Sequence, residues 1–237
     1  MDPLRNSSKA KEIKDYLFSN KLSIDNLNHL YFWIIDIKDE KDINKVLDFF
    51  EEMFLEVAFI EYENKYLMFY FEEISYEVKN IISSIMDDFS VKFKIFASSK
   101  INLDDKNNFF TIYNLYNKYL DRKSNYYLNY IDLITEIIKI NIGDLKLLKP
   151  IILNRLLVDP QMEVLINAMF DSDLNVTQTA NKVYMHRNTV IKKLEYIKNE
   201  TGLNIQRFID ANIMYWLINT KWNNVQVAHC FFIEIKV

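Results

Sequence analysis

Four side chains near the start of one predicted helix have the chemistry to bind nucleic acid. They are Arg187, Asn188, Lys192 and Lys193. An arginine guanidinium can read a guanine edge with two parallel hydrogen bonds, whereas a lysine ammonium contacts phosphate as a point charge. From Lys182 to Lys198 there are five basic residues and one acid, Glu195, which gives a local charge of +4. This pattern predicts a short surface that reads double-stranded DNA.

Two short helices must position these side chains, and the first begins beside Asn175. Asparagine is a favoured N-cap residue, and Gln178, three residues later, suits a capping-box-like arrangement that satisfies the first backbone amides. The inward face of this helix recurs at three- and four-residue spacing: Val176, Thr179, Ala180 and Val183. Ala180 is small enough to let a second helix cross closely at a steep angle.

The second predicted helix carries the basic and polar side chains. Tyr184 and Met185 form the expected turn before it, and His186 is its expected N-cap. The helix runs to Thr201, and Gly202 follows it at a position where a positive φ costs little. Its buried stripe is Val190, Leu194 and Ile197. The two helices and their turn therefore predict a helix-turn-helix.

This pair of helices resembles the C-terminal DNA-binding domain of PucR/CdaR-type bacterial transcription regulators and, more loosely, the Fis-type helix-turn-helix. The resemblance spans about Gln161 to Leu217. It is carried by Asn175-Val176-Thr177, Thr179-Ala180, Val183, His186-Arg187-Asn188-Thr189-Val190, Leu194, Ile197 and Thr201-Gly202-Leu203. One departure is Lys192-Lys193, where the family often has an aromatic residue followed by arginine. The positive charge is kept, but the planar fork of arginine is replaced by a point charge.

The motif and the resemblance together predict a DNA-binding site of nine residues. They are Thr177, Gln178, His186, Arg187, Asn188, Thr189, Ile191, Lys192 and Lys193. We expect Arg187 and Asn188 to contact base edges or nearby phosphates, and the two lysines to contact mainly phosphates, because the start of the second helix enters the major groove in such motifs. Thr177 and Gln178 either grip the DNA backbone or only cap the first helix.

The N-terminal half of the chain follows the order β-α-β-β-α-β over residues 30–99. An apolar, β-rich run at 30–37 precedes a helical stripe, two strands meet at Asn64-Lys65, and a second helical stripe precedes a strand at 91–97. That order predicts a ferredoxin-like (βαββαβ) sandwich. The expected fold class is therefore α+β, with this sandwich, a helical connector and a C-terminal all-α helix-turn-helix domain.

The predicted boundaries divide the chain into four segments. Residues 1–106 form a sensor or dimerisation domain, 107–158 a helical connector, 159–222 the DNA-binding domain and 223–237 a tail. The connector has wide apolar stripes, so it packs against the sandwich, against a second subunit, or against both. The tail alternates like a strand, which fits an edge strand of the N-terminal sheet, pairing across a dimer, or a divergent end.

Glycine is scarce, and this bears on catalysis. The βαββαβ order also underlies nucleotide-cyclase and GGDEF-type domains, and PucR/CdaR-type proteins often carry a degenerate relative of the latter. The hairpin at Tyr62–Tyr66 reads Tyr-Glu-Asn-Lys-Tyr, and the chain has two glycines in all. No glycine-rich loop can therefore close on a phosphate. We expect no enzyme activity, no catalytic residue and no cofactor.

The amino-acid composition excludes several further classes of protein. Residues 1–160 hold 21 Lys and Arg against 26 Asp and Glu, for −5, while 161–237 hold 8 against 7, for +1. An acidic body with a basic reading helix argues against a nonspecific nucleic-acid coat. One cysteine and three scattered histidines predict neither a disulfide framework nor a zinc site. The chain shows no membrane-length apolar run and no secretory pattern, so a cytoplasmic location is expected.

The sequence thus supports two functional hypotheses. The first is a transcription regulator that binds a palindromic operator as a homodimer, with double-stranded DNA as its partner and no membrane contact. The resemblance adds a small-molecule effector, which nothing in residues 1–106 identifies. The alternative is a docking regulator whose helix-turn-helix is vestigial and whose apolar connector or tail binds another protein.

Overall fold

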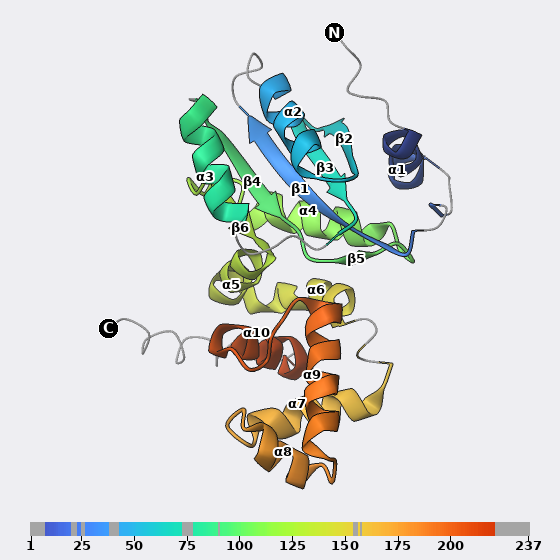
Figure 1. Ribbon diagram of the computed structural model, residues 1–237, viewed down its shortest axis with the longest axis vertical. Helices are drawn as coiled ribbons and strands as arrows, with labels where there is room; N and C mark the ends of the chain where they lie inside the picture. Colours follow the sequence, from blue (N-terminus) through green and yellow to red (C-terminus); the bar gives the residue numbers. More distant parts are fainter. Residues whose placement is uncertain are drawn as a thin grey trace. The chain divides into compact units, whose positions relative to one another are not determined.

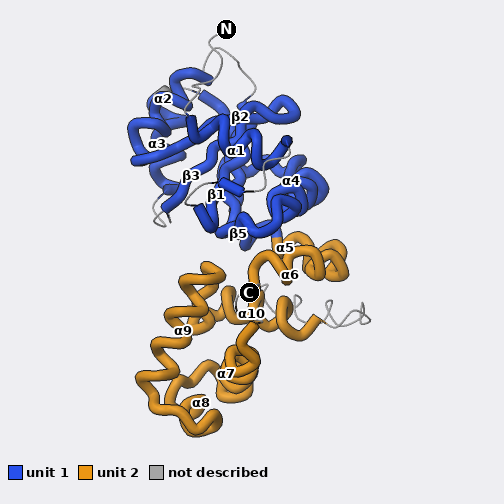
Figure 2. The backbone as a smooth tube through the Cα atoms, turned by 90° about the vertical axis from the view of Figure 1, so that its right-hand side faces the viewer, with its two compact units in different colours: residues 1–133 blue, residues 134–237 orange. Residues whose placement is uncertain are grey.

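The chain folds into two compact units in the computed structural model, which describes residues 8–19, 23–24, 27–37, 43–72, 78–89, 91–153, 156 and 158–220 (Figure 1). The units are residues 1–133 and 134–237 (Figure 2). The first contains a sheet with helices, and the described part of the second contains helices and no strand. The boundary falls inside the segment 107–158 that was expected to be a connector. The predicted tail strand, 223–237, lies outside the described residues.

A single mixed sheet forms the centre of the first unit. Its described strands are β1 (His29–Ile37), β2 (Val57–Tyr62), β3 (Lys65–Tyr70), β4 (Phe93–Ala97), β5 (Ile101–Asn102) and β6 (Tyr127–Asn129). The order is β2-β3-β1-β4-β6, with β5 paired to β1. Neighbouring strands are antiparallel except β4 and β6, which are parallel. The α+β class is confirmed, but β5 and β6 extend the sheet beyond the four strands predicted.

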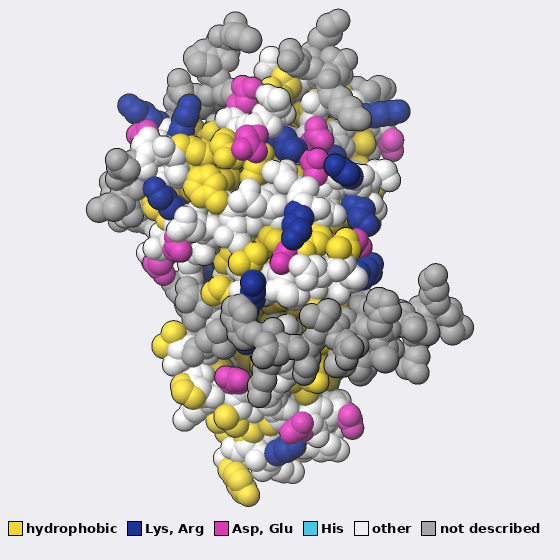
Figure 3. Space-filling model, turned by 180° about the vertical axis from the view of Figure 1, so that it is seen from behind, with side chains coloured by type: hydrophobic (Ala, Val, Ile, Leu, Met, Phe, Trp, Pro, Cys, Tyr) yellow, Lys and Arg dark blue, Asp and Glu magenta, His cyan; other side chains and the backbone are white. Residues whose placement is uncertain are grey.

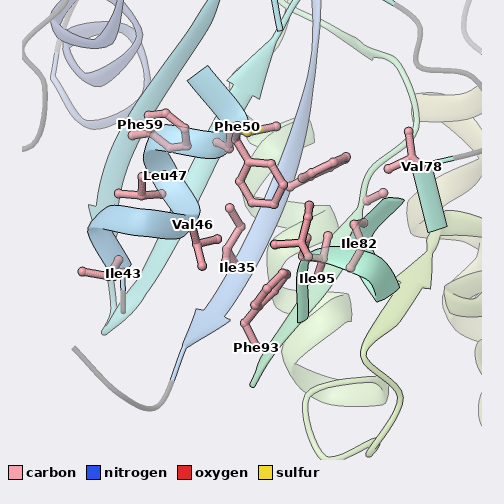
Figure 4. Packing of buried hydrophobic residues seen from close by; sticks show 14 of the residues in the cluster. Ile35, Ile43, Val46, Leu47, Phe50, Phe59, Val78, Ile82, Phe93 and Ile95 are labelled. Carbon is pink, nitrogen blue, oxygen red and sulfur yellow. The ribbon is translucent and has the colours of Figure 1, made fainter. Parts of the chain in front are cut away.

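Helices cover both faces of this sheet (Figure 1). They are α1 (Ser8–Phe18), α2 (Ile43–Met53), α3 (Val78–Phe89) and α4 (Asn107–Tyr119). On one face, Phe50 of α2 and Ile82 of α3 pack in a buried cluster with Ile95 of β4 (Figure 4). On the other face, the ring of Phe109 in α4 lies 5.0 Å from that of Phe32 in β1.

The double covering explains why β1 reads as a continuous apolar run instead of alternating. A strand that is buried on both faces has no solvent side on which polar residues are favourable. Phe32, Trp33, Ile34 and Ile35 are consecutive and all buried. The helix of segment 107–119 belongs to the predicted connector. It packs on the sheet, which was one of the alternatives expected for that segment.

The described part of the second unit contains a short 3-10 turn and α-helices. The boundary between units falls inside α5 (Tyr130–Asn141), and η1 (Ile142–Asp144), α6 (Leu145–Leu153), α7 (Pro160–Phe170), α8 (Val176–Lys182), α9 (Arg187–Thr201) and α10 (Phe208–Asn219) follow. The ammonium of Lys149 in α6 donates to the carbonyl oxygen of Ile218 in α10 at 2.9 Å. The side chains of Leu165, Met169 and Met214 form part of the buried core.

Candidate nucleic-acid interface

Side-chain caps fix where the helices of this unit begin. The carboxylate of Asp159 accepts from the amide of Gln161 at 2.9 Å, and Pro160 occupies the first helical position of α7. At α8, the side-chain oxygen of Asn175 accepts from the amides of Thr177 and Gln178 at 3.0 and 3.1 Å. Helix α8 therefore starts where the sequence predicted, and α7 starts at residue types that favour a helix start.

The capping-box arrangement at α8 differs from the prediction in one bond. A capping box needs the side chain at the third helical position to accept from the amide of the N-cap residue. Here the amide of Asn175 donates to the carbonyl oxygen of Ser172 at 2.9 Å. The turn before α8 thus satisfies that donor, and the exposed side chain of Gln178 does not serve as its acceptor.

Helix α8 packs against α7 and α9 through a narrow inward face. Thr179 and Ala180 are buried, whereas Val176 and Val183 are half-buried. The hydroxyl of Thr179 donates to the carbonyl oxygen of Asn175 at 2.9 Å and lies 3.1 Å from the sulfur of Met169 in α7. The two neighbouring helices can approach α8 closely because the side chain of Ala180 is small and the hydroxyl of Thr179 is hydrogen-bonded within its own helix.

The turn between α8 and α9 is short and hydrogen-bonded. Tyr184 has a φ of 54°, and the amide of Met185 donates to the carbonyl oxygen of Ala180 at 2.9 Å. His186 is the N-cap of α9, and its Nδ1 accepts from the amide of Asn188 at 3.2 Å. Because Nδ1 acts as the acceptor, Nε2 of the neutral imidazole carries the hydrogen and can donate to an outside group.

Helix α9 has a buried stripe and an exposed front. Val190, Leu194, Ile197 and Thr201 are buried and face the core, and Gly202 ends the helix with a φ of 71°, as predicted. Asn188, Lys192 and Glu195 follow one another at four- and three-residue spacing on the opposite side, and all three are exposed. Glu195 sets a limit to this front, because its carboxylate repels phosphate.

The two adjacent lysines of α9 have different surroundings. Lys192 is exposed, whereas Lys193 is half-buried and its ammonium lies 3.9 Å from a carboxylate oxygen of Asp159, the N-cap of α7. A hollow of about 380 Å³ lies between these helices, lined by Asp159, Met162, Thr189, Lys192, Lys193 and Tyr196. The sequence predicted the same role, contact with phosphate, for both lysines. The structure shows that Lys193 is partly neutralised, so Lys192 is the better placed of the two to meet a phosphate.

All nine predicted site residues lie on α8, in the turn, or on the first two turns of α9. Seven are exposed, while Ile191 and Lys193 are half-buried. The amides of Thr177 and Gln178 are already bonded to Asn175, so only their side chains remain available to a ligand. That each residue contacts DNA stays a prediction. Sequence reasoning placed Tyr184 in the turn but not in the site, although its ring is almost fully exposed.

Charge is distributed differently over the rest of the molecule. On the face shown in Figure 3, basic and acidic side chains are interspersed over the first unit and form no field of one sign.

Within the described residues, no three histidine, cysteine or carboxylate side chains are arranged to hold a metal ion. Likewise, none of the described helices has the length and apolar character needed to cross a membrane.

The capped short helix, the tight turn and the exposed basic start of the next helix define a DNA-binding domain of the helix-turn-helix class. Residues 165–213, from within α7 to within α10, match the family model described as the PucR C-terminal helix-turn-helix domain. The chain therefore carries a PucR-type helix-turn-helix domain, as the sequence resemblance predicted.

Two further comparisons accompany this match. A search of curated proteins gives no match. Among solved structures, the chain is similar to the crystal structure of a regulator of polyketide synthase expression from Bifidobacterium adolescentis. The two are 12% identical in sequence, the similarity covers 89% of this chain and 91% of that one, and the TM-score is 0.40.

Proposed function

We propose that this protein is a cytoplasmic transcription regulator that binds a specific double-stranded DNA sequence through α8, the turn and α9. The observation that carries the proposal is the exposure of three side chains on the first two turns of α9: Arg187, Asn188 and Lys192. The buried stripe behind them packs against the rest of the unit, so these side chains are presented from a fixed helix. No catalytic role is part of the proposal.

The exposed residues fall into two proposed roles. Arg187 and Asn188 lie in the first turn of α9, the part of a recognition helix that approaches base edges, and they read sequence. Lys192 lies one turn later and binds phosphate, as do the side chains of Thr177 and Gln178 at the start of α8. Glu195 ends the contact surface, which restricts DNA to the N-terminal half of α9.

The proposed form on DNA is a homodimer on a palindromic operator. One recognition helix reads only a few base pairs, and two-fold pairing places a second copy about one helical turn, roughly 34 Å, along the duplex. The first unit is then a sensor or dimerisation domain that regulates binding in response to a small-molecule effector. The identity of that effector is not part of the proposal.

A pull-down on fragments of the host genome tests the proposal. The purified full chain is mixed with the fragments at several salt concentrations, with Arg187→Ala as the matched variant. We expect wild-type protein to enrich a few palindromic sites and the variant to lose them while keeping the same circular dichroism spectrum. Diffuse enrichment by folded wild-type protein at every salt concentration would contradict sequence-specific binding.

A docking function is the second candidate, and exposed apolar side chains in the second unit favour it. Phe208 and Ile209 at the start of α10 are 68% and 58% exposed, and Val164 of α7 is 60% exposed. Exposed apolar side chains of this kind suit contact with a protein partner. Salt separates the two functions, since DNA binding weakens steeply as salt rises and an apolar protein contact does not.

A further inference from the structure

Tyr184 in the turn between α8 and α9 has no role in the core of the second unit. Its side chain is 98% exposed, the highest value among the large hydrophobic side chains that the structure describes. Leaving an aromatic ring in water forgoes the free energy that its burial supplies, so the fold gains nothing from the ring at this place.

The backbone at Tyr184 is also unfavourable for an aromatic residue. Its φ of 54° lies in the left-handed region, where a Cβ atom is strained and glycine is favoured. At the end of α9 the chain places a glycine, Gly202, in this conformation, with a φ of 71°. Leu174 also has a positive φ, of 61°, but its side chain is half-buried. Tyr184 combines the strained backbone with an unburied ring.

Backbone hydrogen bonds hold the turn without help from the phenol. The amide of Tyr184 donates to the carbonyl oxygen of Asn181 at 3.3 Å, and the next amide, of Met185, donates to that of Ala180 at 2.9 Å. Any residue that accepts a positive φ can make these two bonds. The turn therefore requires the backbone conformation at position 184 and does not require a tyrosine.

The position of the ring fits contact with a DNA strand. Tyr184 precedes the N-cap His186 by two residues and Arg187 by three, and all three side chains are exposed. A tyrosine hydroxyl donates readily to a phosphate oxygen, and its ring packs on the adjoining sugar. We infer that Tyr184 contacts the DNA backbone directly, so that the turn adds this side chain to the contacts proposed for α8 and α9. This inference rests on the function proposed above.

Substitution by glycine separates a contact from a structural role, because the two roles predict opposite changes. Tyr184→Gly relieves the positive-φ strain, so the unfolding midpoint of the full chain should stay the same or rise. The affinity for an operator fragment recovered from the pull-down should fall roughly tenfold at fixed salt. Phe208→Ala, which removes an exposed aromatic ring from α10, is the matched control and should leave the affinity unchanged.

The hydroxyl is tested separately with Tyr184→Phe, which keeps the ring. We expect this variant to lose severalfold in affinity on the operator and on unrelated DNA alike, because a phosphate contact carries no sequence information. Wild-type affinity in the glycine variant would overturn the inference while leaving the proposed function in place. Wild-type affinity in the phenylalanine variant would overturn the hydroxyl contact. Folded wild-type protein that recovers no specific fragment would overturn the proposed function itself.

Discussion

Single residues decide where the DNA-reading helices start and what they present. Asn175 and His186 each close the first turn of a helix with a side-chain acceptor, which fixes the position of every later residue on that helix. Arg187 and Asn188 are exposed because they follow directly on the second cap, before the first buried position at Val190. The cap and the contact residues are thus parts of one local arrangement.

The first prediction compares Asn175→Ala with Gln178→Ala. Loss of the asparagine cap leaves two amides without their acceptor and should cost about 1 kcal/mol of unfolding free energy. Loss of the Gln178 side chain should leave stability nearly unchanged, because Ser172 already accepts from the Asn175 amide. Urea unfolding of the full chain measures both. Equal destabilisation by the two variants would mean that the capping box forms after all.

The second prediction concerns the adjacent lysines of α9. Lys192→Ala should weaken DNA binding and lower the slope of log affinity against log salt by about one. Lys193→Ala should change the affinity and the salt slope less, since the Lys193 ammonium is half-buried beside Asp159. Salt titrations of each single variant on the same fragment provide the comparison. A larger change in slope for Lys193→Ala would reverse the proposed order, and the double variant should lose operator binding.

At the scale of elements, the close packing of α8 and α9 sets the geometry of the reading surface. Ala180 is 3% exposed, and the amide of Met185 donates to its carbonyl oxygen. A larger side chain there has no space and must push the helices apart. The contact residues of α9 would then move relative to α8, although none of them is altered.

The third prediction is that Ala180→Leu reduces DNA binding through packing alone. The insertion should cost about 1–3 kcal/mol of unfolding free energy and weaken the operator complex. Thermal unfolding and operator titration are measured on one preparation. Ala168→Leu, at a buried position of α7 outside the predicted contact residues, provides the matched control. An undisturbed operator affinity in a destabilised Ala180→Leu protein would show that the α8–α9 crossing does not position the contacts.

The elements that could be predicted from the sequence are those set by short-range interactions. The residues at the helix ends make hydrogen bonds with partners only a few positions away in the chain, and each lies at the kind of helix end that its type favours. They are Asp159-Pro160, Asn175, His186 and Gly202. The parallel pairing of β6 with β4 was missed, and the packing of α4 on the sheet was expected only as one of several alternatives. Both depend on contacts between distant segments, for which periodicity gives no partner. The exposure of Tyr184 was not predicted. The direction of its side chain depends on the backbone φ, and tyrosine is not a residue type that indicates a positive φ.

The whole molecule combines an acidic chain with one locally basic helix. Its net charge is −4, so bulk attraction does not bring it to DNA, and binding must rely on the contacts of the second unit. A single copy of such a small surface reads only a few base pairs. The proposed dimer solves this by doubling the site, and it makes a quantitative prediction about stoichiometry.

The fourth prediction is that two chains bind one palindromic operator cooperatively. Sedimentation of the complex should give two chains per duplex, and a duplex with a single half-site should bind far more weakly. Moving the half-sites apart by five base pairs, about half a helical turn, should abolish the gain, because the second helix then faces the wrong side of the duplex. One chain per operator with unchanged affinity would contradict the dimer and leave DNA binding intact.

The most direct test of the central claim is the affinity of wild-type and Arg187→Ala protein for one recovered operator fragment and for a scrambled duplex of the same length, at matched salt. The account predicts that wild-type protein prefers the operator and that the variant, equally folded, binds both duplexes alike. Retention of the wild-type preference by Arg187→Ala would contradict the claim that the start of α9 reads the DNA sequence.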